Sequence, residues 1–124
     1  MVKKITEYSE QIKLVSWFRL KYPKHKYLLT HFANGGFRTA KSGSLFKALG
    51  VVAGYPDLVL FVPRNGFPGL FIEMKKPIIP GKPKAYVSSE QKEIMQLLKE
   101  QGYCVTLAYG FDEARNTIIE YMRD

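Results

Sequence analysis

Five apolar residues in a row, Leu58–Val62, constrain the fold of this 124-residue chain more than any other feature. A strand with one face in water alternates apolar and polar side chains, whereas an uninterrupted apolar strand needs cover on both faces. A second apolar segment, Leu70–Lys75, follows after a connection rich in Pro and Gly. The two segments together favour a sheet covered by helices, which is an α/β fold.

Seven elements are predicted, in the order α-β-β-β-α-β-α. They are a helix over 6–22, strands over 27–32, 58–62 and 70–75, a helix over 88–102, a strand over 103–108 and a helix from 112. Three strands in succession favour antiparallel pairing, and the later β-α-β unit needs a parallel crossover. We therefore expect a mixed β-sheet flanked by helices, built as one domain over residues 1–124.

The ends and faces of the helices follow from capping residues and from apolar spacing. Thr6 and Asp112 are the predicted N-caps of the first and last helices, and Ser88 opens the middle one. The residues predicted to point inward are Tyr8, Ile12, Val15, Phe18 and Tyr22, then Ile94, Leu97 and Leu98, then Ala114, Ile118 and Tyr121. After the turn at 34–36, a basic loop is predicted to run on through residue 47.

The positive charge is concentrated in one part of the chain. The formal net charge is +8, and residues 1–50 carry ten basic and two acidic side chains while residues 51–124 carry nine of each. An excess of this kind favours a surface that faces a polyanion such as nucleic acid. A solubilising surface is the simplest alternative, and an anionic membrane surface is another.

Other features narrow the class of protein. No apolar run approaches the roughly 20 residues of a membrane span, and the N-terminus lacks the apolar core of a secretory signal. Cys104 is the single cysteine, so an internal disulfide is excluded and a reducing compartment fits. His25 and His31 have neither cysteine partners nor helical spacing, so no zinc site is expected. We expect a soluble cytoplasmic protein with no membrane partner.

Three charged residues interrupt the apolar strands. Asp57 follows Pro56 directly, at the head of the first apolar strand, and Glu73 and Lys75 lie two apart on the next strand and so share a face. A Glu–Lys pair at a fraying strand end, with Asp57 in a turn, would explain each residue separately. Together they suit phosphodiester chemistry, because two carboxylates hold a hard cation such as Mg²⁺ and a lysine stabilises negative charge.

The sequence around these residues resembles a known family. Gly54-Tyr55-Pro56-Asp57, followed by Glu73-Met74-Lys75, resembles the PD-(D/E)XK nuclease motif. The flanking segments, 47–50 and 88–91, are similar to those of the VRR-NUC branch, which comprises small nucleases of phages, bacteria and repair enzymes. The likeness spans the chain from Glu10 to the last helix, and it implies a restriction-endonuclease-like fold.

The resemblance also implies roles for individual residues. Asp57 and Glu73, with the backbone carbonyl of Met74, would hold Mg²⁺ or Mn²⁺, and Lys75 would be the catalytic lysine. Glu10 matches an acidic residue that many such nucleases carry on the first helix. Leu14 and Trp17 place Glu10 on a partly buried stripe, although a solvated helix carboxylate explains it equally well.

Two further family matches have local explanations as well. Gln91 matches a glutamine that the family carries at the start of the helix after the catalytic strand. Ser88 and Gln91 also have the spacing of a capping box, which would explain the glutamine without catalysis, and both roles can coexist. Asn34 and the glycines after it resemble a family loop near the site, and a tight turn accounts for them equally.

These observations predict a divalent-metal-dependent endonuclease that hydrolyses DNA. The phosphate-contacting residues are expected in the basic first half and in the 77–87 loop: Asn34, Arg38, Lys41, Lys47, Lys82 and Lys84. The rival is a catalytically silent nucleic-acid-binding module on the same fold. By analogy with junction resolvases, we expect a homodimer acting on branched or four-way DNA, with apolar residues of the terminal helices, such as Ile119 and Met122, as the candidate interface.

Overall fold

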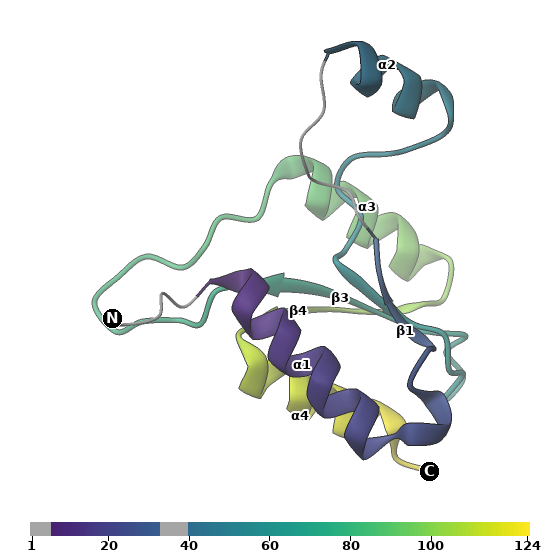
Figure 1. Ribbon diagram of the computed structural model, residues 1–124, viewed down its shortest axis with the longest axis vertical. Helices are drawn as coiled ribbons and strands as arrows, with labels where there is room; N and C mark the ends of the chain where they lie inside the picture. The colour runs from purple at the N-terminus through teal and green to yellow at the C-terminus, as the bar shows by residue number, and fades with distance from the viewer. Residues whose placement is uncertain (1–5, 33–39) are drawn as a thin grey trace.

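The computed structural model describes residues 6–32 and 40–124, with side chains in the second range from residue 43 onward. Its elements, in chain order, are α1 (Glu7–Lys21), η1 (Pro23–His25), β1 (Leu29–His31), α2 (Ala40–Ala48), β2 (Leu58–Leu60), β3 (Leu70–Lys75), α3 (Ser89–Glu100), β4 (Cys104–Tyr109) and α4 (Phe111–Met122). Figure 1 shows these elements arranged around a four-stranded sheet. No helix in these ranges is both long and apolar enough to cross a membrane.

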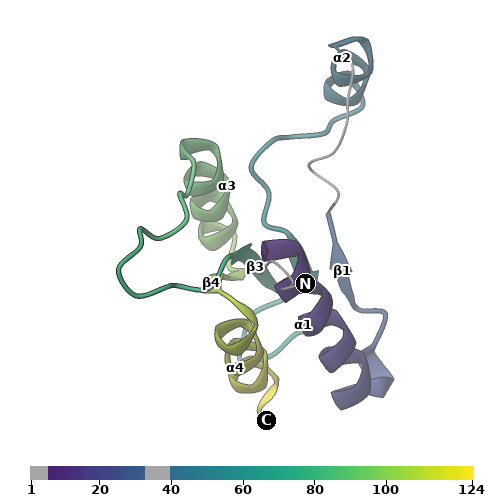
Figure 2. The ribbon, with the colours of Figure 1, turned by 60° about the vertical axis from the view of Figure 1, so that its left-hand side comes forward.

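The sheet has the mixed pairing that the strand order predicts. The strands lie in the order β1-β2-β3-β4, with β1–β2 and β2–β3 antiparallel and β3–β4 parallel. Helices α1 and α4 lie side by side on one face, and α3 lies on the other (Figures 1 and 2). All three residues of β2 are fully buried, which confirms a strand covered on both faces.

The core lies between the sheet and the α1–α4 pair. Its most deeply buried members come from α1, β2, β3, β4 and α4: Leu14, Phe18, Leu58, Leu60, Leu70, Ile72, Met74, Ala108, Ala114 and Ile118. The inward face predicted for the last helix is confirmed by Ala114, Ile118 and Tyr121, all of which are buried. The core anchors the strand ends that carry the charged residues.

The inward face predicted for the first helix is confirmed only in part. Phe18 is fully buried and Val15 and Tyr22 pack against the core, but Tyr8 and Ile12 are 67% and 66% exposed. The other buried side chains of α1 are Glu10 and Leu14. Apolar residues surround α1 on several sides, so spacing alone does not choose the face that packs against the sheet. The predicted cap is confirmed, because the Thr6 hydroxyl accepts a hydrogen bond from the Ser9 N–H at 3.0 Å.

Three other local predictions are corrected. The predicted basic loop contains a helix, α2, which is drawn well away from the sheet in Figures 1 and 2. Its Gly and Ser content conceals it, because both residues favour turns over helices. The last helix is capped by Gly110 and not by Asp112, which lies in the first turn. Of the three residues predicted to point inward from α3, Ile94 and Leu98 are partly buried and Leu97 is half exposed.

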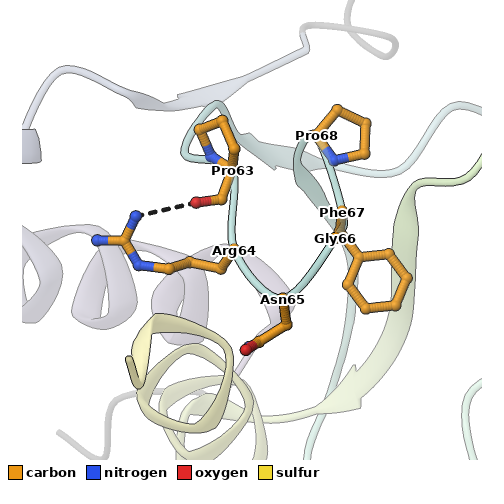
Figure 3. A pocket seen from close by; sticks show the side chains of 6 residues that line it. All are labelled: Pro63, Arg64, Asn65, Gly66, Phe67 and Pro68. Atoms are coloured by element: carbon orange, nitrogen blue, oxygen red, sulfur yellow. Dashed lines mark hydrogen bonds between the residues drawn. The ribbon is translucent and has the colours of Figure 1, made fainter.

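The connection between β2 and β3 is a tight hairpin. Asn65 and Gly66 both have positive φ angles, +52° and +84°, as the two central residues of a type I′ turn require. Arg64 and Phe67 on either side exchange both backbone hydrogen bonds. Residues 63–68 line a hollow of about 470 Å³ (Figure 3). This hollow lies at the opposite end of β3 from Glu73 and Lys75.

Candidate active site

Strand register brings Asp57 opposite Glu73. Leu58 pairs with Ile72, so the residue before β2 lies across from the residue after Ile72. The Asp57 carbonyl accepts a hydrogen bond from the Phe32 N–H at 3.0 Å, which continues the β1–β2 ladder by one residue. Pro56, fully buried, restricts the backbone just before the aspartate. Asp57 therefore lies immediately before β2, an inner strand, at one end of the sheet.

The carboxylate of Asp57 is oriented by strand β3. Its Oδ2 accepts a hydrogen bond from the Met74 N–H at 2.8 Å. The side chains of Glu73 and Lys75 are almost completely buried, with 3% and 7% of their surfaces exposed. The two charges form an ion pair, with Lys75 Nζ 3.3 Å from Glu73 Oε2. The structure thus brings all three predicted core residues into one cluster.

Gln91 joins the cluster from the first turn of α3. Its Nε2 donates to Glu73 Oε2 at 2.8 Å, and its Oε1 accepts from Lys75 Nζ at 3.0 Å. The same Oε1 accepts from the Ser88 N–H at 3.0 Å, and the Ser88 hydroxyl accepts from the Gln91 N–H. The capping box is therefore present, and the same carboxamide also contacts both buried charges. Gln91 therefore completes the capping box and contacts Glu73 and Lys75 with the same side chain.

The pKa of Glu73 is raised to about 8, and burial is the largest cause. Repulsion by the Asp57 carboxylate, and a hydrogen bond between the two carboxyl groups, also raise the pKa. The Lys75 ammonium acts in the opposite direction, by its charge and by its hydrogen bond. One lysine therefore does not compensate two carboxyl groups in a site that is largely shielded from water.

Gly54 holds the turn before Asp57 against α3. A Cβ at this position would lie 2.6 Å from the carbonyl oxygen of Glu90, and the φ angle is +97°. Both conditions exclude a larger residue, because real Cβ atoms do not approach backbone that closely and L-residues avoid this φ. The contact keeps the start of α3, and with it Gln91, beside the Asp57 turn. Sequence reasoning treated Gly54 only as part of a motif.

Glu10 is buried but has partners of its own. Its Oε1 accepts a hydrogen bond from the Phe111 N–H at 3.2 Å, and its Oε2 lies 3.2 Å from the Lys13 ammonium. Glycine has no side chain to cap a helix, so Glu10 provides the hydrogen-bond acceptor for the N-terminus of α4 in place of Gly110. The predicted stripe with Leu14 is confirmed, and the carboxylate is not a solvated one.

Within residues 6–32 and 43–124, no three His, Cys, Asp or Glu side chains gather closely enough to hold a metal ion.

Three of the predicted DNA-contacting residues are described by the structure, and they lie on segments outside the strands that carry the carboxylates. Lys47 is exposed on α2, and Lys82 and Lys84 are exposed on the connection between β3 and α3. The ammonium of Lys84 lies 5.5 Å from the centre of the Tyr109 ring. Asn34, Arg38 and the side chain of Lys41 lie outside the described residues.

The donor set of the cluster fits a hard divalent cation. Two carboxylates and the adjacent carbonyl of Met74 are all oxygen donors, which Mg²⁺ and Mn²⁺ prefer. A positive ion would also balance the negative charge that raises the pKa of Glu73. The residues at Asp57 and Glu73 are thus chemically suited to such an ion.

A four-stranded mixed sheet with flanking helices, carrying Asp57, Glu73 and Lys75 at its edge, defines a nuclease-type α/β domain. The model of the VRR-NUC domain family matches residues 5–112, and the chain belongs to this family. A solved structure named "VRR_NUC domain protein" is similar, with 31% sequence identity and a TM-score of 0.80. The match covers 98% of this chain and 91% of that one. A comparison with curated proteins finds no similar sequence.

Proposed function

We propose that this protein is a divalent-metal-dependent endonuclease that hydrolyses phosphodiester bonds in DNA. The observation that carries the proposal is the buried cluster in which Gln91 and Lys75 both contact Glu73, opposite Asp57. A merely structural pair would need no second carboxylate beside it, since a second negative charge in a poorly hydrated site is unfavourable. An arrangement that is unfavourable alone, and is relieved by a cation, is typical of a metal-binding catalytic site.

Each residue of the cluster has a separate role in this proposal. Asp57 and Glu73, with the Met74 carbonyl, hold Mg²⁺ or Mn²⁺, which supplies charge neutralisation at the phosphate. Lys75 places an ammonium beside the reacting phosphate, where it orients the attacking water or stabilises negative charge. Gln91 fixes the position of Lys75, because its Oε1 accepts from Nζ while its Nε2 holds Glu73.

The substrate is recognised mainly through its phosphates. We assign this contact to the basic residues between positions 38 and 47, to those of the β3–α3 connection and to one asparagine: Asn34, Arg38, Lys41, Lys47, Lys82 and Lys84. Lysine and arginine bind the DNA backbone irrespective of sequence, so these residues provide affinity and position. Glu10, which holds the N-terminus of α4, is proposed as a further acidic residue acting toward the metal. The proposed place of action is the cytoplasm of a bacterial or phage-infected cell.

Incubation with DNA tests the activity directly. The purified protein should cut plasmid DNA with Mg²⁺ or Mn²⁺ and stop when EDTA is added. A protein that binds the same DNA in a mobility-shift assay but leaves it uncut with either metal would be the catalytically silent module. That outcome would contradict the proposed function.

We further propose that the protein acts on branched or four-way DNA as a two-fold homodimer. A domain of this size has one active site, and symmetric cutting of two strands needs two copies. Met122, one of the predicted interface residues, belongs to the core with 8% exposure, so it is unavailable for pairing. Exposed apolar side chains on α1 include Tyr8, Ile12 and Leu20.

Two measurements test this part of the proposal. Light scattering during size exclusion should give twice the chain mass of 14.2 kDa. A panel of nicked, flapped, single-stranded and four-way substrates should show preferential cutting of the four-way junction. A monomer that cuts linear and four-way DNA at the same rate would contradict it.

A further inference from the structure

His31 contacts the backbone of Asp57. Its Nδ1 lies 2.8 Å from the Asp57 carbonyl oxygen, which also accepts the Phe32 N–H at 3.0 Å. Two neighbouring residues at the end of β1 therefore hold the same carbonyl. His31 lies opposite Leu58 in the register, so its position is set by the last regular pair of the β1–β2 ladder.

The contact specifies the tautomer of the imidazole. A carbonyl oxygen only accepts hydrogen bonds, so Nδ1 has to carry the proton at a distance of 2.8 Å. The carboxamide nitrogen Nε2 of Gln11 on α1 lies 3.2 Å from the same Nδ1. A protonated Nδ1 does not accept from an amide N–H, so the Nδ1–H form requires the Gln11 amide to be turned by 180°, with Oε1 toward the ring. The two ends of an amide are assigned from the hydrogen-bond network, so the Asp57 carbonyl decides both assignments. His31 thus lies between α1 and Asp57.

Asp57 needs such an anchor because it lies outside the regular strand. β2 contains only three residues, Leu58–Leu60, and Asp57 precedes the first of them. The side chain is held from the β3 side by the Met74 N–H, and the main chain is held from the β1 side by Phe32 and His31. Loss of the β1 contact would let the main chain at Asp57 rotate and would carry its carboxylate away from Glu73.

We propose that His31 is a positioning residue, whose Nδ1–H fixes the Asp57 carbonyl and thereby the carboxylate that binds the metal. This inference rests on the proposed function, since it concerns the same carboxylate. Groups that orient a metal ligand typically contribute about 10- to 100-fold to metal affinity or activity. The effect of His31 is therefore expected in metal binding first, and in cleavage as a consequence.

The tautomer is tested without metal or DNA. Long-range ¹⁵N–¹H correlation spectra distinguish the two neutral forms of each imidazole at about pH 8.5, where a free imidazole is neutral. The chain has two histidines, so the spectrum of a His25→Ala variant assigns the signals. We expect the Nδ1–H form for His31 and no such requirement for His25. A predominant Nε2–H form of His31 would overturn the inference, because that form cannot donate to Asp57.

Metal binding is tested with three variants and Mn²⁺. His31→Ala should weaken Mn²⁺ affinity in calorimetry by about 10-fold or more. His31→Asn should stay within about threefold of wild type, because the asparagine Nδ2 is a donor placed close to where Nδ1 lies. His25→Ala removes the same side chain from η1, away from Asp57, and should leave affinity unchanged.

The outcomes separate this inference from the proposed function. If the wild type binds Mn²⁺ and Asp57→Asn does not, while His31→Ala binds as the wild type does, the role of His31 is refuted and the proposed function stands. If the wild type itself binds no Mn²⁺, the proposed function fails and this inference fails with it. Should His31→Ala not fold, as judged by its melting temperature in EDTA, the comparison of His31→Asn with wild type and the tautomer decide the question.

Discussion

At the residue scale, the ionised form of the Glu73 carboxyl group is unfavourable in its surroundings. Its side chain is 3% exposed, so water stabilises its negative form poorly. Lys75 and Gln91 both bond to Oε2, but Asp57 adds a second carboxyl on the same edge of the sheet. The balance of these contacts leaves Glu73 with a pKa of about 8, so a proton or a cation is favoured there.

The raised pKa predicts how the stability of the metal-free protein depends on pH. Between the ordinary value of 4.5 and the folded value of about 8, the folded chain holds a proton on Glu73 that the unfolded chain has lost. The free energy of unfolding should therefore fall as pH rises through this range. Melting temperatures in EDTA should show the decline in wild type relative to Glu73→Gln, which lacks the titrating group. Parallel curves for the two proteins would contradict the assignment, and added Mg²⁺ should reduce the decline.

Conservative changes in the three core residues test their roles in catalysis. Asp57→Asn and Glu73→Gln should each abolish DNA cleavage while leaving folding and DNA affinity in EDTA near wild type, because shape is retained and the charges that hold the cation are removed. Lys75→Ala should reduce the cleavage rate by ~100-fold or more, as the loss of one preorganised charge-stabilising group does. Glu93→Ala, an exposed carboxylate of α3, is the matched control. Turnover near wild type in Asp57→Asn or Glu73→Gln would remove the basis of the proposed mechanism.

At the scale of elements, the site depends on how α3 is joined to the turn before β2. Gly54 packs against the backbone of Glu90 and Gln91, and the Gln91 side chain reaches Glu73 and Lys75 on β3. The first turn of α3 therefore contacts both halves of the site. A shift of this helix by even a small distance would separate the glutamine from the buried charges.

Gly54→Ala tests this contact, with Gly81→Ala as a matched control. Both glycines have positive φ, +97° and +79°, so each alanine carries the penalty of about 1–2 kcal/mol for that conformation. Only at Gly54 does the added methyl also meet backbone, at 2.6 Å from the Glu90 carbonyl oxygen. Gly54→Ala should therefore lower the melting temperature more than Gly81→Ala and should also reduce cleavage. Equal effects of the two changes on both measurements would argue against the contact with α3.

The double role of Gln91 can be divided by a second pair of variants. Gln91→Ala removes the capping interaction and the contacts with Glu73 and Lys75, so we expect a large loss of cleavage and a loss of stability of ~1 kcal/mol or more. Ser88→Ala removes only the acceptor for the Gln91 N–H and should cost a similar ~1 kcal/mol with little effect on cleavage. If cleavage falls to the same extent in the two variants, Gln91 acts only through the cap.

At the scale of the whole molecule, the described lysines of the predicted DNA contact lie on two segments outside the sheet that carries the acidic site. Lys47 is carried by α2, which is drawn far from the sheet, and Lys82 and Lys84 lie on the long connection between β3 and α3 (Figures 1 and 2). The cluster of Asp57 and Glu73 lies at the end of the sheet from which both segments depart. DNA that contacts both segments would pass this edge of the sheet.

Removing the positive charges between positions 38 and 47 should change how DNA binding depends on salt concentration. Replacing Arg38, Lys41 and Lys47 with glutamine should weaken binding to every DNA sequence alike. The slope of log K against log salt should flatten by up to about 0.9 for each phosphate that the protein no longer neutralises. Lys24→Gln with Lys26→Gln removes charge from the opposite end of β1 and is the control. An unchanged salt dependence in the triple variant would place the DNA path elsewhere on the surface.

Much of the architecture follows from residues that are neighbours in the chain. The apolar run at 58–62 predicts a strand covered on both faces, and Ser88 predicts the start of α3; both are confirmed. Glu73 and Lys75 share a face because alternate residues of a strand do. These features depend on backbone geometry and on spacing within one element, which the order of amino acids specifies directly.

The remaining features depend on contacts between segments that are far apart in the chain. Spacing placed apolar residues on more than one side of α1, and the buried face is chosen by what packs against it, including the N-terminus of α4 at Glu10. Gly54 meets the backbone of Glu90 on α3, and His31 meets Asp57 across 26 residues of chain. The local conformational preference of a residue such as Gly54 or His31 does not depend on its distant neighbours. Its contact partner is therefore determined only when the helices and strands pack together.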